Sequence, residues 1–96
     1  MIKVLEGFKV KQGADMQPVL LRLRSDAMQY PGFVSAENMI NRRDVSIVIV
    51  ISTWERVDDW EMWENSELRL KLLREVEPLL EDKTRATSYV IMPTQG

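Results

Sequence analysis

The sequence predicts an α+β domain in which four strands form an antiparallel sheet and the helices cover one of its faces. Residues 2–11 and 45–54 show the two-residue alternation of strands. Residues 15–30 and 66–80 carry apolar side chains at three- and four-residue steps, as amphipathic helices do. The order strand, helix, strand, strand, split helix, strand is the split βαβ pattern of a ferredoxin-like fold.

The composition sets limits on function. The 96 residues correspond to one domain, residues 1–96, with a modest core. A net charge of -2 gives no reason to expect nucleic acid or an anionic membrane as partner. The sequence has neither cysteine nor histidine, which removes disulfides, thiolate ligands and the usual general base near neutral pH. Without a secretory leader pattern or a long apolar run, a cytoplasmic protein is expected.

The first strand is predicted at residues 2–11, with Glu6 on its apolar face. The apolar side chains of that face are Ile2, Val4, Phe8 and Val10. The pattern therefore places a carboxylate among apolar side chains. If the helices cover this face, burial would raise the pKa of Glu6 and suit it to act as a base.

A helix is predicted to follow Asp15, whose side chain is suited to cap it. It runs to about Tyr30, where "PG" stops it. Residues 33–42 are then predicted to form a second strand, and "NRRD" a turn.

The third strand, residues 45–54, is apolar on both faces. One face carries Val45, Ile47, Ile49 and Ile51, and the other carries Val48, Val50 and Trp54. Both faces should therefore be covered, but the helices of such a fold cover only one. A second copy of the chain is the economical cover for the other, so we expect a homodimer packed sheet to sheet.

A split helix and a last strand complete the chain. "RVDDWEMWEN" is predicted to be a short helix with Val57, Trp60 and Trp63 on one side. Ser66 is the expected N-cap of the next helix, "ELRLKLLREVEPLL", which Pro78 kinks or ends. Its apolar stripe is predicted to hold Leu68, Leu72, Val76 and Leu79 or Leu80, with Leu73 alongside. Residues 85–92 form the last strand.

Three segments in this order, "FKVKQG", "YPGFVSAEN" and "STWERVDDWEMWENSELRLKLL" followed by "EPLL", resemble the antibiotic biosynthesis monooxygenase superfamily. The resemblance covers nearly the whole chain. It implies a homodimeric α+β barrel with a ligand cavity between the sheet and the helices. It also implies, as in some members, oxidation of phenolic, anthrone or quinol substrates by O₂ without a cofactor.

The heme-degrading branch of that superfamily uses an Asn on the first strand, a Trp on the short helix and a His on the next helix. Trp63 matches the Trp position, whereas Glu6 stands at the Asn position and Leu73 at the His position. The missing axial imidazole argues against heme degradation.

The leading hypothesis is a cofactor-independent monooxygenase acting on a small aromatic, quinol or polyketide-like substrate. Glu6 and Trp63 are the candidate catalytic residues. The candidate substrate-binding residues are Trp54, Trp60, Asn38, Tyr89 and Leu73.

Alternatives remain open at this stage. The tryptophans can serve simply as core, which we favour for Trp60, whereas Trp63 is the best candidate for a pocket wall. Glu6 can pair with an arginine such as Arg22 or Arg85 instead of acting on a substrate. The rival function is a non-catalytic dimer that binds a small molecule.

Overall fold

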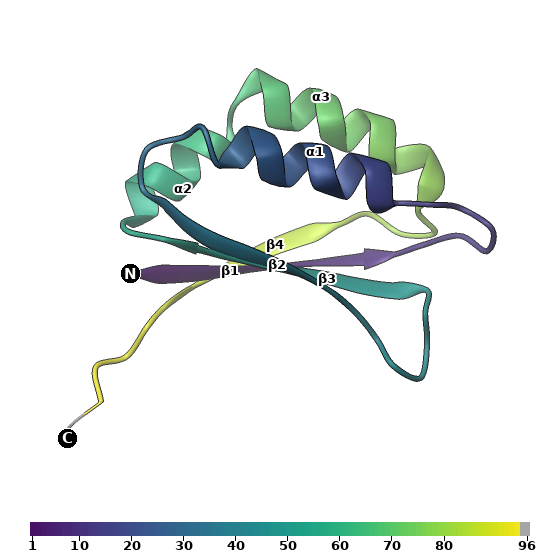
Figure 1. Ribbon diagram of the computed structural model, residues 1–96, viewed down its shortest axis with the longest axis horizontal. Coiled ribbons are helices and arrows are strands. Elements are labelled where there is room, and N and C mark those ends of the chain that lie inside the picture. The colour runs from purple at the N-terminus through teal and green to yellow at the C-terminus, as the bar shows by residue number, and fades with distance from the viewer. Residues whose placement is uncertain (95–96) are drawn as a thin grey trace.

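A computed structural model describes residues 1–94 and contains one four-stranded sheet in the order β2-β3-β1-β4. The strands are β1 (Ile2–Lys9), β2 (Phe33–Ile40), β3 (Ile47–Trp54) and β4 (Arg85–Val90), and every neighbouring pair is antiparallel. The helices are α1 (Gln17–Ala27), α2 (Val57–Glu64) and α3 (Glu67–Val76), followed by the 3₁₀ turn Glu77–Leu79. All the helices lie on one face of the sheet (Figure 1). The predicted ferredoxin-like architecture is confirmed.

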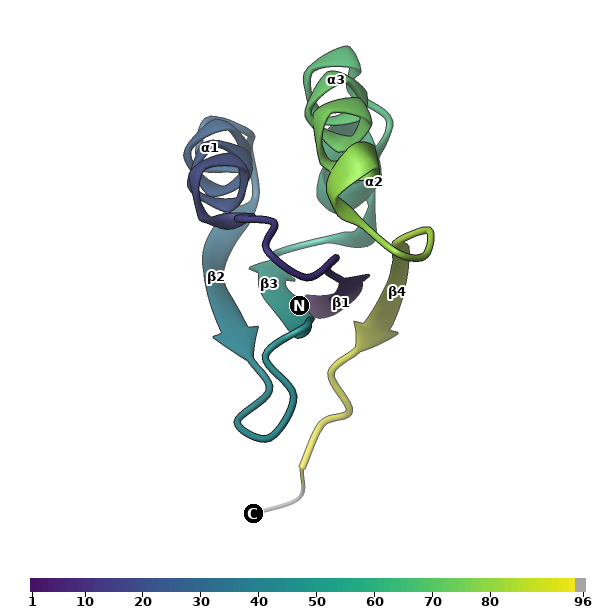
Figure 2. The ribbon, with the colours of Figure 1, turned by 90° about the vertical axis from the view of Figure 1, so that its right-hand side faces the viewer.

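The helices form two groups over the sheet. Seen along the strands, α1 lies above the β2 edge, whereas α2 and α3 lie towards the β4 edge (Figure 2). The space between these groups and the sheet is where the core and the candidate site are found.

Local sequence signals explain the helix ends. Ser66 Oγ accepts a hydrogen bond from the Arg69 backbone N–H at 3.1 Å, which confirms the predicted N-cap of α3. The α-helix ends at Val76, before Pro78, and the chain continues as the 3₁₀ turn. The prediction that Asp15 caps α1 is wrong, because the N-cap is Met16 and makes no side-chain capping bond. Asp15 Oδ1 instead accepts from the Gln17 N–H at 3.0 Å, one residue before the N-cap.

The first helix is shorter than predicted, because it ends at Ala27 and not near Tyr30. The Tyr30 N–H donates to the Ala27 carbonyl in a turn, and Gly32 then adopts a φ of 83°. This left-handed conformation, which glycine tolerates best, redirects the chain into β2.

Two apolar clusters form the core beneath the helices. One joins β1 to α1 and α3 and includes Phe8, Leu20, Leu72 and Val76. The other contains all three tryptophans together with Ile2, Val4 and Ala27.

The prediction that Val57 and Leu68 face the core is wrong, since 44% and 41% of their surfaces are exposed. On α3, the buried residues are instead Arg69, Leu72 and Val76. Arg69 therefore occupies an interior position in the first turn of this helix.

The face of the sheet opposite the helices is apolar at its centre. The pairing register places Leu5 opposite Ile51, and Gly7 opposite Ile49, on this face. Met39 pairs with Ile49 from the β2 side. These β3 isoleucines are only half-buried in the single chain. The expected cover, a second copy of the chain, remains a prediction.

Within residues 1–94, no helix is both long enough and apolar enough to cross a membrane.

Candidate active site

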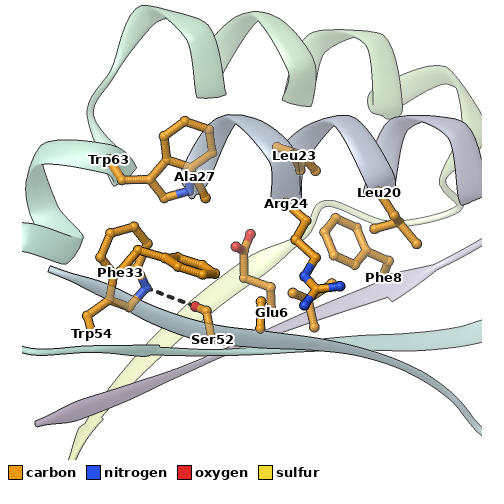
Figure 3. A pocket seen from close by; sticks show the side chains of 12 residues that line it. Glu6, Phe8, Leu20, Leu23, Arg24, Ala27, Phe33, Ser52, Trp54 and Trp63 are labelled. Carbon is orange, nitrogen blue, oxygen red and sulfur yellow. Dashed lines mark hydrogen bonds between the residues drawn. The ribbon is translucent and has the colours of Figure 1, made fainter. Parts of the chain in front are cut away.

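A small cavity lies between the sheet and the helices α1 and α2 (Figure 3). Its volume is about 30 Å³, which is room for about one or two water molecules. Most of its wall is apolar, and the larger apolar side chains are Phe8, Leu20, Leu23, Phe33, Trp54 and Trp63. Three polar residues, Glu6, Arg24 and Ser52, also line it.

Glu6 reaches this cavity because strand alternation turns it to the same side as Val4 and Phe8, beneath the helices. Its side chain is only 12% exposed. Its partners across the sheet are Val50 on β3 and Ala86 on β4, neither of which offers a polar group. The predicted position of this carboxylate among apolar side chains is confirmed.

Arg69 is the partner of Glu6. Its Nη2 donates a hydrogen bond to Glu6 Oε2 at 2.8 Å, and its side chain is 6% exposed. Arg69 Nη1 donates to the Glu64 carbonyl at 3.2 Å, and the guanidinium carbon lies 5.2 Å from the centroid of the Trp60 ring. Within the described residues, Arg69 Nε is buried without a hydrogen-bond partner.

The sequence had suggested Arg22 or Arg85 as partners, and both suggestions are wrong. Arg22 pairs with Glu75 on the surface at 2.8 Å. Arg85 pairs in the sheet with Gly7. Because neighbouring residues of a strand project to opposite faces of the sheet, Arg85 lies on the face away from Glu6. The sequence did contain a signal for Arg69, because this residue stands three positions before Leu72 and seven before Val76, in line with the buried stripe.

Burial is the main influence on the pKa of Glu6, and it raises this pKa above the ordinary value of 4.5. The charge and the hydrogen bond of Arg69 act in the opposite direction, and the nearby Glu64 carboxylate adds a smaller upward push. The net result is a raised pKa, so the carboxylate of Glu6 is a stronger base than one in water. Among residues 1–94, its recorded hydrogen bond uses Oε2, which leaves Oε1 available to a ligand.

The three tryptophans divide between wall and core. Trp63 forms part of the cavity wall and packs edge-on against Tyr30, with ring centroids 5.0 Å apart. Trp54 also lines the cavity, and its Nε1 donates to Ser52 Oγ at 3.0 Å (Figure 3). Trp60 is buried beside Trp54, with centroids 5.9 Å apart, but does not line the cavity.

The other candidate residues lie elsewhere in the single chain. Asn38 lines a separate groove beneath the first half of α1, and Leu20 borders both this groove and the cavity. Leu73 borders a surface groove with Leu70 and Leu80. Tyr89 pairs with Lys3 on the open face of the sheet and is 54% exposed. The structure therefore does not bring Asn38, Leu73 or Tyr89 to Glu6.

Residues 1–94 contain no group of three or more Asp and Glu side chains that could hold a metal ion. The site consists instead of one paired carboxylate, aromatic walls and an arginine. Such an arrangement suits proton transfer from a bound aromatic molecule.

The fold and this interior site define a ferredoxin-like α+β protein with a candidate ligand cavity under its helices. Comparison with solved structures gives strong matches. A structure described as an antibiotic biosynthesis monooxygenase matches with a TM-score of 0.85 and 16% identity, over 97% of this chain and 100% of the other.

Two further structures have the same fold. SnoaB, a cofactor-independent oxygenase from Streptomyces nogalater, matches with a TM-score of 0.84 and 18% identity, over 97% of this chain and 94% of the other. Rv0793 from Mycobacterium tuberculosis matches with a TM-score of 0.85 and 12% identity, over 99% of this chain and 98% of the other. No protein-family profile and no curated protein sequence matches the chain significantly. The resemblance seen in the sequence is confirmed as a likeness of fold to antibiotic biosynthesis monooxygenase structures.

Proposed function

We propose that the chain is a cofactor-independent monooxygenase that oxidises a small aromatic, quinol or polyketide-like substrate with O₂. The observation that carries this proposal is the position of Glu6, a buried carboxylate with a raised pKa at an aromatic-walled cavity. The fold shared with SnoaB, described as a cofactor-independent oxygenase, supports this reaction class.

Glu6 acts as the general base. Arg69 holds Oε2, so Oε1 takes the proton from a phenolic hydroxyl or from the carbon acid conjugated with it. The charge and hydrogen bond of Arg69 lower the pKa of Glu6 from the level that burial alone would give, which favours the carboxylate form that accepts the proton. The aromatic rings of Trp63 and Trp54 hold the substrate ring and exclude water.

The substrate anion is itself the reductant for O₂. One electron passes from the anion to O₂, and the resulting substrate radical and superoxide combine to form a carbon–oxygen bond. The peroxide then loses water, so that a CH₂ group and one O₂ become one carbonyl and one H₂O. In this last step the remaining proton of the carbon passes to the outer peroxide oxygen, the O–O bond breaks to release hydroxide, and the hydroxide receives the proton held by Glu6 to form water.

The catalytic unit is a homodimer packed through the open face of the sheet. The apolar centre of this face is formed by Leu5, Met39, Ile47, Ile49 and Ile51. A second copy would remove this apolar surface from water, which would stabilise the dimer by about 25 cal/mol for each Å² of apolar surface buried.

A non-catalytic binding dimer is the second candidate. It is favoured by the ion pair with Arg69, which already engages Glu6 Oε2. Both candidates require side chains to move, because the cavity volume of about 30 Å³ is too small for an aromatic ring. Such a protein would bind an aromatic molecule in the same place without consuming O₂.

Oxygen uptake by chelator-treated protein, over a panel of quinols, anthrones and catechols, tests the proposal. We expect uptake of one O₂ for each carbonyl formed, unaffected by the chelator and strongly reduced in Trp63→Ala. Arg74→Gln is the control, because Arg74 is exposed on α3 and outside the cavity. Ligand binding without uptake across the panel would favour the binding dimer.

A further inference from the structure

Arg24 is an unusual member of the cavity wall. Although it is exposed on α1, its side chain extends towards the sheet between Glu6 and Phe8 (Figure 3). It lines the cavity beside Leu20, Leu23 and Ala27 of the same helix. Arg24 therefore occupies space that a ligand would need, with an exposed side chain that can reach water at its charged end.

The positive charge of Arg24 is not balanced inside the site. The charge of Glu6 is balanced by Arg69, and the side chains that shift the pKa of Glu6 are Arg69 and Glu64, with Arg24 not among them. Arg22, two residues away, pairs with Glu75. Among residues 1–94, the recorded ion pairs do not include Arg24.

The other two polar residues of the wall already have partners, since Glu6 pairs with Arg69 and Ser52 Oγ accepts from Trp54 Nε1. Arg24 thus provides the cationic hydrogen-bond donors of a mostly apolar wall. A guanidinium binds a carboxylate or another anionic oxygen group through two parallel N–H donors. Its exposure means that pairing with a ligand requires little desolvation.

We infer that the substrate is an aromatic acid, whose anionic group Arg24 binds while its oxidisable hydroxyl points towards Glu6. This inference rests on the proposed function and names the substrate class. The anion draws the guanidinium away from the space between Glu6 and Phe8, and the aromatic ring takes its place against Trp63 and Phe33. Arg24 is therefore both the cover of the empty cavity and its recognition group.

The test compares the affinity of two probes, naphthol and a hydroxynaphthoic acid with its hydroxyl and carboxyl groups on opposite rings. Binding is followed by quenching of tryptophan fluorescence or by calorimetry, under nitrogen so that no turnover occurs. The variants are Arg24→Gln, Arg24→Lys and the control Arg74→Gln, which removes the same charge outside the cavity. All these positions are exposed, so the variants should fold.

We expect wild type to bind the acid about tenfold more tightly than naphthol, as a charge-assisted hydrogen bond provides. Arg24→Gln should lose this preference and keep its affinity for naphthol, Arg24→Lys should keep part of it, and Arg74→Gln should keep all of it.

The inference is overturned if Arg24→Gln still prefers the acid. It is also overturned if Arg24→Gln loses affinity for both probes equally, because Arg24 would then serve only as part of the wall. Equal binding of both probes by wild type overturns this inference but leaves the proposed function standing. Binding of neither probe contradicts both.

Discussion

Arg69 Nη2 lies 2.8 Å from Glu6 Oε2, although the two residues are 63 positions apart in the sequence. This ion pair joins β1 to α3, and its Glu6 end lines the cavity. It is nearly excluded from water, with side chains 6% and 12% exposed. The same contact therefore links β1 to α3 and lowers the pKa of the candidate base from the level that burial alone would give.

Breaking this pair on one side should destabilise the fold far more than replacing both partners. Glu6→Leu or Arg69→Met alone leaves one buried charge unpaired and should lower the free energy of unfolding by about 3 kcal/mol. The double variant should recover most of that loss, because two apolar side chains replace two charges. Urea unfolding at one fixed protein concentration measures all four forms. If the double variant loses as much free energy of unfolding as the two single variants added together, the two residues are not coupled.

The raised pKa of Glu6 has a defined effect on stability. Above pH 4.5, the ordinary pKa, the folded protein holds this proton more tightly than the unfolded chain does. The contribution of Glu6 to stability is therefore complete below that pH and is lost as the pH rises through the raised pKa. The unfolding free energy of wild type relative to that of Glu6→Gln should therefore fall as the pH rises from about 4 to about 8.

Taking this difference also cancels the opposite contribution of Asp44, whose pKa is lowered, mainly by hydrogen bonds from Ser46. A difference that does not vary with pH, or that varies in the opposite direction, would show that the pKa of Glu6 is not raised.

Gly32 should tolerate alanine less well than Gly13, although both have a φ of 83°. At Gly13 the new methyl group would meet nothing within 4 Å, so Gly13→Ala should cost only the strain of the left-handed backbone, about 1–2 kcal/mol. At Gly32 the methyl group would overlap the carboxylate of Asp59, which is buried on α2. Urea unfolding should show a larger loss for Gly32→Ala, and equal losses would contradict the close approach of Asp59.

A charge at the centre of the open sheet face should prevent self-association. Ile49 lies between Gly7 and Met39 on that face, so Ile49→Lys would bury an unpaired ammonium in a sheet-to-sheet dimer. Sedimentation equilibrium should give a dimer for wild type and a monomer for Ile49→Lys at micromolar concentration. Leu68→Lys, on the exposed side of α3, is the control and should remain dimeric. A dimeric Ile49→Lys would place the interface elsewhere.

The strands could be predicted from the sequence because β1 alternates apolar with mostly polar side chains, whereas β3 is a run of apolar, largely β-branched side chains. The alternation around Glu6 located the carboxylate correctly without any structure. The position of Trp63 in the cavity wall followed from the family resemblance together with helical spacing.

Other parts of the site could not be predicted in the same way. Arg69 interrupts an apolar stripe, and only the tertiary structure shows that its charge meets a residue on β1. Arg24 lies on an exposed helix surface, and periodicity does not determine where so long a side chain points. Tyr89 was misplaced because β4 has no clear apolar face, so its sequence does not indicate which side chains meet the helices.

Oxygen consumption by Glu6→Gln on the best substrate of the panel tests most directly whether Glu6 is the base. Glutamine keeps the size of the side chain and an oxygen for Arg69, but it cannot take a proton at neutral pH. We expect at least a 100-fold loss of the rate in Glu6→Gln, with binding of the substrate retained. Wild-type rates in a correctly folded Glu6→Gln variant would contradict the assignment of Glu6 as the base.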